Sequence, residues 1–366
     1  MRTAIVHDYL SQRGGAERVV LAMAGLFPDA PIFTSFYSSD LTYPDFAGLD
    51  VRTSSLQGSI DPEHFRRSVL RLPGVFARLD LSAFDQVIVS SSAFAHHIRH
   101  RHSMVYCYTP PHFLYDTRAY MGSRARAGLT RPILAPMRRR DRAAAARHCS
   151  YAAISRQSAR QIRAVYGRVS PVIYPPLSTE HLPAEIGPMP LEPRAMVVAR
   201  LLPYKRVDVA IRACATAGVD LTVVGLGPEE TRLRRLATRG VTFLGRVDDS
   251  ELAQLFRDHS LVLAPGLEDF GYGPVEANYA GRPVIALAGG GALETVEDGA
   301  NGVLVEGWDV DRWAAAVTGA LSRTWDPADL RATTRRFDAD TFGKSLRQWV
   351  ESTWEPPQGQ VRAAVD

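Results

Sequence analysis

The stretch AMVVARLLPYKRVDVAIRACATAGVDLTVVG, residues 195–225, reads as a buried strand, a helix and a second buried strand. Both AMVVA and LTVVG are apolar at almost every position, which is typical of parallel strands covered on both faces. Between them, apolar side chains recur at i, i+3, i+4 and i+7, the spacing of one helix face: Val207, Ala210, Ile211 and Cys214. The segment therefore predicts a parallel β-α-β unit.

The same alternation continues toward the C-terminus. Four more short apolar runs follow: VTFLG (241–245), LVLAP (261–265), PVIAL (283–287) and GVLVE (302–306). Helix-length segments separate these runs, and strands that alternate with helices predict a doubly wound α/β domain.

The first half shows a weaker version of this pattern. Its expected strands are Thr3–His7, Pro31–Tyr37, Gln86–Ser90, Met104–Tyr108, Tyr151–Ile154 and Val172–Tyr174. Between the two halves, residues 171–193 hold seven prolines, which disfavour both helix and central strand. We therefore expect two α/β domains, residues 1–186 and 187–336, with ligands bound in the cleft between them.

Composition agrees with two globular cores. The chain has 366 residues, of which 46% are hydrophobic and 22% charged, so wholesale disorder is excluded. Its three cysteines are scattered without C-x-x-C spacing, which argues against a disulfide framework or a structural zinc site. No signal-peptide core and no run of about 18 apolar residues is visible, so the sequence predicts a cytoplasmic location.

The charge is unevenly distributed. Residues 1–186 carry 23 Lys and Arg against 14 Asp and Glu, whereas residues 187–366 carry 20 against 25. A basic first half favours an anionic partner, such as a membrane surface or a phosphorylated acceptor, and no nucleic acid is expected. Two segments mix arginines with apolar residues as interfacial helices do, Arg66–Leu79 and Arg124–His148, although prolines are expected to break both. The alternative is a solvated arginine-rich face.

Two loops carry candidate phosphate-binding groups. Gly14 and Gly15 open a helix, where unpaired amides attract anions. Arg200 follows the strand AMVVA, and Lys205 precedes the next helix. Two such cations suit a diphosphate leaving group, whose developing charge must be neutralised by fixed donors.

Two carboxylates lie close together in LEDFGYGPVEANYAGRPVIA, residues 267–286. Glu268 is expected in a loop and Glu276 on the helix that begins near Pro274. Carboxylates accept hydrogen bonds from vicinal hydroxyls, so the pair suits a sugar and a ribose. Gly289–Gly291 follow the next strand as a second possible phosphate cradle.

The histidine-rich segment AHHIRHRH, residues 95–102, invites a metal interpretation. His96 and His100 share one face if the segment is helical, but no carboxylate accompanies them at ligand spacing. A solvated basic helix end is therefore the preferred interpretation, and no metal is expected. Neither G-x-G-x-x-G nor a P-loop occurs, which disfavours dinucleotide-dependent oxidoreductases and P-loop NTPases.

Taken together, RGGAERVV, VVARLLPYKRVDVAI, VTFLGRVDDSEL and EDFGYGPVEANYAGRPVIA with GGGALETVEDGANGVLVE resemble the glycosyltransferase family 4 enzymes. The resemblance runs from residue 3 to about residue 322 and is nearest to bacterial mannosyltransferases of polysaccharide assembly. It implies a GT-B fold of two Rossmann-like domains and a tail, residues 337–366, that packs back on the first domain.

The resemblance also implies roles for individual residues. Arg200 and Lys205 would hold the donor diphosphate, Glu268 the donor sugar, and Glu276 the nucleotide ribose. The rest of the donor pocket would comprise Gly14, Gly15, Tyr108, Arg246, Val247, Phe270 and Gly271. Catalysis would then be electrostatic, with retention of configuration and no metal or other cofactor.

One departure concerns the segment VYCYTPPHFLYD, residues 105–116. Tyr108 stands where close relatives carry a histidine that contacts the donor sugar, and tyrosine cannot be cationic near neutral pH. His112 is the candidate that compensates or touches the acceptor.

The expected function is transfer of a hexose, with mannose from GDP-mannose favoured, to a lipid-linked saccharide or another glycoconjugate. A UDP- or dTDP-sugar donor is the alternative within the family. A GT-B sugar-nucleotide epimerase and a non-catalytic sugar-nucleotide-binding protein are the alternatives outside it. The enzyme is expected in the cytoplasm, with the inner face of the plasma membrane as a candidate peripheral contact.

Overall fold

The computed structural model describes residues 1–58, 70–116 and 124–353, with the side chains of residues 124–133 excepted. Two compact units result. The first comprises Met1–Ile154, Ser158–Pro175 and Asp340–Asp366, and the second comprises Ser155–Gln157 and Pro176–Ala339.

The division therefore lies at Pro175/Pro176, where the sequence analysis placed it at 186/187. Hydrogen bonds explain the difference, because the proline-rich segment is tied to the second unit. The Arg331 guanidinium donates to the carbonyls of Pro183 and Ala184, and Arg282 donates to those of Gly187 and Pro188. Carbonyls in a segment that makes no regular secondary structure need such donors when they are buried.

The first unit contains a six-stranded parallel sheet in the order β3-β2-β1-β4-β5-β6. Its strands are β1 (Thr3–His7), β2 (Ile32–Thr34), β3 (Val51–Thr53), β4 (Gln86–Ser91), β5 (Ser103–Cys107) and β6 (Ser150–Ala153). The short strand β3 was not expected, because three residues give too little periodicity to read.

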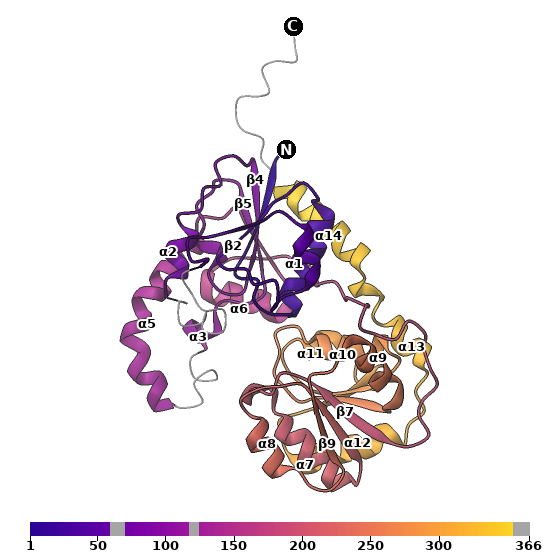
Figure 1. Ribbon diagram of the computed structural model, residues 1–366. Coiled ribbons are helices and arrows are strands. Elements are labelled where there is room, and N and C mark those ends of the chain that lie inside the picture. Colours follow the sequence, from indigo (N-terminus) through magenta and orange to yellow (C-terminus); the bar gives the residue numbers. More distant parts are fainter. Residues whose placement is uncertain (59–69, 117–123, 354–366) are drawn as a thin grey trace. The chain divides into compact units, whose positions relative to one another are not determined.

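Helices surround this sheet, and among the described residues they are α1 (Gly15–Leu26), α2 (Leu72–Phe76), α3 (His112–Tyr115), α5 (Arg124–Ala145) and α6 (Arg156–Tyr166), with 3-10 turns η1 (Pro44–Gly48) and η3 (Ala95–His97). The C-terminal helix α14 (Ala339–Thr353) lies beside α1 (Figure 1). Gly343 of α14 faces Leu26 of α1 so closely that an added Cβ would lie 2.9 Å from Leu26 Cδ2. The indole of Trp349 donates to Ser150 Oγ at 2.9 Å.

The second unit repeats the architecture with the order β12-β11-β10-β7-β8-β9. Its strands are β7 (Arg194–Val198), β8 (Asp220–Val224), β9 (Val241–Gly245), β10 (Leu261–Ala264), β11 (Val284–Leu287) and β12 (Gly302–Val305). Its helices are α7 (Val207–Ala217), α8 (Glu230–Leu236), α9 (Asp249–Asp258), α10 (Tyr272–Tyr279), α11 (Ala292–Thr295), α12 (Val310–Leu321) and α13 (Pro327–Ala332), with 3-10 turns η4 (Pro203–Lys205) and η5 (Arg335–Phe337).

Both sheets share one strand order. Counted within its own unit, each reads 3-2-1-4-5-6, the order of dinucleotide-binding α/β folds. The prediction of two Rossmann-like, doubly wound domains is confirmed. In such a sheet, ligands bind outside the carboxyl ends of strands 1 and 4, where the strand order reverses.

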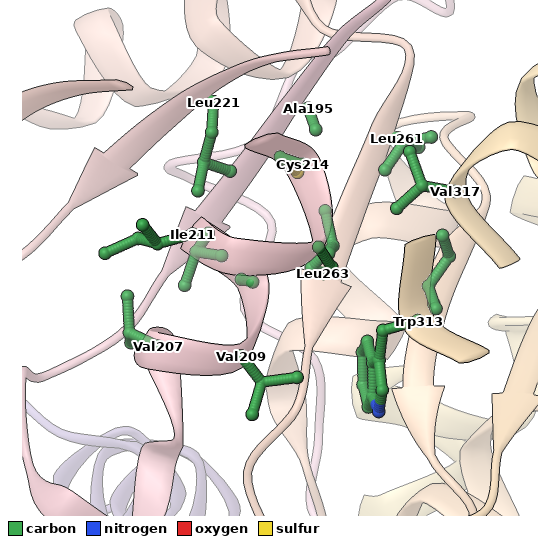
Figure 2. Close-up of a cluster of buried hydrophobic side chains, with 14 of the residues drawn as sticks. Ala195, Val207, Val209, Ile211, Cys214, Leu221, Leu261, Leu263, Trp313 and Val317 are labelled. Carbon is green, nitrogen blue, oxygen red and sulfur yellow. The ribbon is translucent and has the colours of Figure 1, made fainter. Parts of the chain in front are cut away.

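Figure 2 shows the core of the second unit, where α7 and α12 cover the sheet. The stripe predicted on α7 is buried, with Val207 and Cys214 at 2% and 0% exposure. The Trp313 side chain of α12 is fully buried among these residues, and its indole donates to the carbonyl of Gly307 at 3.0 Å. Burying such a ring and satisfying its N–H is a large contribution to the core.

Two expectations were wrong. Val172 makes only an isolated bridge to Ala153, because the prolines on either side, Pro171 and Pro175, interrupt the ladder. Helix α5 runs through Pro132 and Pro136, which were expected to break it. Pro136 lies on the exposed side of α5 while Leu134 is buried, so side-chain packing holds the helix across the missing hydrogen bond.

Two predictions concern the membrane, the absence of a spanning helix and an interfacial contact. No helix in the described ranges is long and apolar enough to span a bilayer. Of the predicted interfacial segment Arg66–Leu79, residues 66–69 lie outside the described residues, as do residues 354–366 of the predicted tail. Contact with an anionic membrane stays a prediction.

We expect one fast-reacting thiol in the native chain. Cys149 is exposed, whereas Cys107 and Cys214 are buried, and burial raises the pKa of the Cys214 thiol to about 12. Since the thiolate is the reactive form, Cys214 should be inert near neutral pH. Titration with a thiol reagent should label Cys149 first and all three cysteines in denaturant. Fast labelling that persists in Cys149→Ser would contradict this burial pattern.

Candidate functional site

The candidate site of the second unit lies at the carboxyl edge of its sheet. Arg200 and Lys205 follow β7, which is strand 1 of this sheet, and Glu268 follows β10, which is strand 4. These strands are neighbours, so the two segments emerge where the strand order reverses. Arg200, Lys205 and Glu268 were predicted from the sequence, and the sheet topology brings their segments together.

Lys205 and Glu268 form an ion pair across this point. The Lys205 ammonium donates to Glu268 Oε1, and the side chains are 17% and 31% exposed. The ammonium also lies 5.3 Å from the centre of the Tyr204 ring. Arg200 is exposed and has no ion-pair partner within the described part of the chain. Lys205, which is paired, and Arg200, which is exposed, therefore both lie near the point where the strand order reverses.

A glycine turn packs directly against the Glu268 segment. The amide of Gly291 donates to the Glu268 carbonyl at 2.8 Å. Gly290 has a φ of +60°, and a Cβ there would lie 2.3 Å from the Glu268 carbonyl oxygen. At Gly291 an added Cβ would lie 2.2 Å from the Phe270 carbonyl oxygen. Glycine is required because the two loops touch backbone to backbone.

This packing bears on the interpretation of Gly289–Gly291 as a phosphate cradle, which stays a prediction. The amide of Gly289 donates to Leu287 and that of Gly291 to Glu268, at 2.7 and 2.8 Å. Because these two amides already donate to carbonyls of the chain, they are not available to an anion. Gly290 and Gly291 also pack against the backbone of the Glu268 segment.

Phe270 and Gly271 lead from Glu268 into α10. The Phe270 ring is 3% exposed and meets the rings of Tyr272 and Phe337 edge-on, with centroids 5.1 and 5.4 Å away. Only the backbone of Phe270 is therefore placed to meet a ligand. Gly271 caps α10 at a φ of +83°, a conformation that glycine adopts without strain.

Glu276 on α10 has a partner that sequence reasoning missed. His181 Nε2 lies 3.0 Å from Glu276 Oε1, and the two side chains are 4% and 15% exposed. The histidine comes from the proline-rich segment, where nothing in the local pattern marks it. It holds the carboxylate in one orientation.

Arg246 and Val247 lie farther along the same edge. They follow β9, which is separated from β7 by β8. Two strand spacings correspond to about 10 Å. Arg246 is exposed, and Val247 is half-buried. They thus lie on the carboxyl edge of the sheet, away from the Lys205–Glu268 pair, and their contact with a donor stays a prediction.

In the first unit, Gly14 and Gly15 follow β1 and open α1. A Cβ on Gly14 would lie 2.7 Å from Glu17 Oε2, the far end of a side chain. Glu17 is 1% exposed, and within the described residues neither of its oxygens accepts a hydrogen bond. His7 Nε2, from the end of β1, lies 3.9 Å from Glu17 Oε1.

Tyr108 lies beside the same turn. Its hydroxyl donates to the carbonyl of Ala16 at 3.1 Å and lies 2.9 Å from Ser90 Oγ, which in turn lies 3.0 Å from His7 Nδ1. Tyr108 therefore stabilises the opening of α1 through its hydroxyl. Its predicted contact with a donor sugar stays a prediction.

His112 begins the short helix α3 and is half-buried. Its Nε2 lies 3.5 Å from Thr109 Oγ1, and the Thr109 hydroxyl donates to Gln161 Oε1 at 2.8 Å. Both Gly14–Gly15 and His112 belong to the first unit, whereas Arg200, Lys205, Glu268 and Glu276 belong to the second.

The chain is similar in sequence to known proteins. Residues 178–337 match the family model described as "Glycosyl transferases group 1". The chain is similar to the D-inositol 3-phosphate glycosyltransferase of Mycobacterium marinum, with 36% identity over 182 residues, 46% of this chain and 39% of that protein. The Mycobacterium tuberculosis protein of the same name is 39% identical over 147 residues, which cover 36% of this chain and 30% of that protein. The matches thus span less than half of these relatives.

Solved structures agree with the fold over nearly the whole chain. The Anabaena protein HepE in complex with UDP superposes with a TM-score of 0.74 at 20% identity, covering 96% of this chain and all of that one. A sucrose-phosphate synthase of Thermosynechococcus elongatus superposes with a TM-score of 0.70 at 17% identity. The match covers 96% of this chain and 99% of that one. These likenesses show the fold, the GT-B arrangement of two Rossmann-like domains.

Replacing Gly290 should disturb the site. In Gly290→Ala the new methyl group meets the Glu268 carbonyl oxygen in a left-handed backbone conformation, so we expect a loss of about 1–3 kcal/mol in unfolding free energy. The matched control is Gly319→Ala on α12, where a Cβ meets nothing within 4 Å. That variant should gain about 0.5–1 kcal/mol. Urea unfolding measures both, and equal stabilities would refute the packing described.

Proposed function

We propose that the chain is a group 1 glycosyltransferase that transfers a hexose from a nucleotide sugar to a saccharide or glycoconjugate acceptor with retention of configuration. The observation that carries the proposal is the Lys205–Glu268 pair at the point where strand order reverses. It lies within the segment that matches the family model.

The cations suit a diphosphate leaving group. Breaking the bond between the sugar and the diphosphate leaves negative charge on the bridging oxygen, and fixed cations stabilise that charge. Arg200 is exposed and unpaired in the described chain, and Lys205 is held in place by Glu268. In the proposed complex both cations bind the diphosphate, and Glu268 turns to the hydroxyls of the donor sugar.

The second carboxylate suits the nucleoside. Glu276 is oriented by His181 on α10. An ionised carboxylate accepts two hydrogen bonds from the vicinal hydroxyls of a ribose. We assign no covalent nucleophile, and the proposed transfer uses electrostatic stabilisation without a metal or other cofactor.

For the donor, the sequence resemblance favours GDP-mannose. UDP sugars are the second candidate, because HepE was crystallised with UDP and with UDP-glucose. Because Tyr108 stands where close relatives carry a histidine, donor sugars other than mannose are also candidates. For the acceptor we propose a lipid-linked saccharide, with an inositol phosphate as the second candidate after the names of the mycobacterial relatives.

Two other functions share the fold. A sugar-nucleotide epimerase needs further acid and base residues beside the site, and a non-catalytic binding protein does not need the four charged residues Arg200, Lys205, Glu268 and Glu276 together. The presence of all four residues at one edge of the sheet therefore supports sugar transfer. We place the enzyme in the cytoplasm, with an anionic membrane surface as a candidate contact for the basic first unit.

Nucleotide binding is the first test. We expect GDP and GDP-mannose to raise the melting temperature, since a ligand of the folded state stabilises it by mass action. The shift should be the same with and without EDTA when each is compared with its own baseline. Stabilisation by UDP or dTDP alone would replace GDP-mannose as the proposed donor by a UDP or dTDP sugar. No shift in melting temperature with any nucleotide would contradict the proposal.

Variants test the ion pair. Lys205→Ala and Glu268→Gln should each lower sugar transfer, or donor hydrolysis in the absence of acceptor, by about 10²–10³-fold. The matched control is Glu230→Gln, which breaks the Arg234–Glu230 pair on α8 and should leave activity unchanged. Circular dichroism checks that all three stay folded. The Lys205 and Glu268 side chains are 17% and 31% exposed, so each site variant is also compared with wild type in urea unfolding. Full activity in either site variant would contradict the assignment.

A further inference from the structure

The first unit contains a buried cluster of two histidines and an aspartate outside the proposed donor site. His96 and His97 lie in η3, which follows β4, and Asp141 comes from the last turns of α5. No carboxylate lies at ligand spacing in the sequence, but Asp141, 44 residues after His97, meets both histidines in space. The interpretation as a solvated helix end was wrong, because His96 and His97 are buried in a 3-10 turn. His100, the expected partner of His96, instead lies 3.0 Å from the Phe84 carbonyl.

The three side chains present metal-ligand atoms to one another. His96 Nε2 and His97 Nε2 lie 3.0 and 3.3 Å from the same oxygen, Asp141 Oδ1. All three ligand atoms lie within 4.8 Å of one another. Zinc bonds of about 2.0–2.1 Å in a tetrahedron place neighbouring ligand atoms about 3.3 Å apart. Two of the three separations already match that geometry.

The cluster combines a buried carboxylate with a buried ring nitrogen that makes no hydrogen bond in the described chain. The Asp141 side chain is fully buried, and no Lys or Arg of the described chain pairs with it. His96 Nε2 is also buried and, despite its closeness to Asp141, makes no hydrogen bond of acceptable geometry. A buried ring nitrogen without a hydrogen-bond partner, beside a buried carboxylate, needs an explanation such as an ion.

The surrounding hydrogen bonds orient the ligands. The hydroxyls of Tyr115 and Tyr166 both donate to Asp141 Oδ2 at 2.8 Å, which leaves Oδ1 directed at the histidines. Ser91 Oγ lies 3.4 Å from His96 Nδ1, so Nε2 is the nitrogen that remains for a metal. Outer partners of this kind hold metal ligands in place.

We infer that His96, His97 and Asp141 bind one divalent transition-metal ion, with zinc as the best match. Two imidazoles and one carboxylate are ligands that zinc prefers, whereas calcium and magnesium need oxygen ligands. The ion neutralises the buried carboxylate and ties η3 to α5 within the first unit. Its role is structural, separate from the charged residues of the second unit.

Metal content of the full chain tests this inference. The protein is produced with added zinc, without a polyhistidine tag, and analysed by mass spectrometry of the metal after gel filtration. We expect about one zinc per chain. Stripping with a chelator should lower the melting temperature, and zinc should restore it by mass action. Cobalt(II) should give the visible absorption of a tetrahedral site.

Variants locate the ion. His97→Gln and Asp141→Asn should lose it, and Tyr166→Phe should weaken binding about 10–100-fold, because it removes only an outer hydrogen bond. The control is His259→Gln, which changes a buried histidine of the second unit and should keep the full metal content. If the ligand variants do not fold by circular dichroism, Tyr166→Phe and the cobalt spectrum carry the test.

A wild-type chain that retains no zinc and shows no thermal shift would overturn the inference. So would equal metal binding by wild type, His97→Gln and Asp141→Asn. In either case the cluster is held together by hydrogen bonds without a metal ion. Neither result bears on sugar transfer, which is measured separately on the Lys205 and Glu268 variants.

Discussion

The Lys205–Glu268 ion pair depends on one topological constraint, the reversal of strand order between β7 and β10. Because these strands are neighbours, the segments that leave their carboxyl ends meet, and a cation from one reaches a carboxylate from the other. The glycine turn after β11 completes the arrangement, since only residues without a Cβ let its backbone reach the Glu268 carbonyl. The strand order of the second sheet thus places the charged residues of the candidate site.

The first sheet uses its own reversal point differently. The Asp8 carboxylate, just after β1, accepts hydrogen bonds from the backbone amides of Ser92, Ala93, Phe94 and Ala95 at 2.6 to 2.9 Å. A carboxylate bound this way fixes the segment after β4, strand 4 of this sheet. That segment leads directly into His96 and His97. The buried cluster therefore rests on the same neighbouring pair of strands.

Two buried or half-buried arginines connect irregular chain to regular structure in the second unit. Within the described residues, Arg282 donates to carbonyl oxygens and a methionine sulfur, among them the carbonyls of Phe256 and Pro188. Arg331 donates to Tyr279, Ala184 and Pro183. The five donors of a guanidinium suit a segment whose prolines cannot form a ladder. This is why the proline-rich segment belongs to the second unit rather than forming a free linker.

The sequence by itself determined the alternation of strands and helices, and with it the sheet edge that carries Arg200, Lys205, Glu268 and Glu276. Periodicity is local, and parallel strands present their carboxyl ends on one edge, so these residues could be found without coordinates. Only the tertiary structure decided that His181 meets Glu276, that the Tyr108 hydroxyl meets Ala16, and that Asp141 meets His96 and His97. Such contacts join residues far apart in the chain, and no local pattern records which buried polar groups the packing brings together.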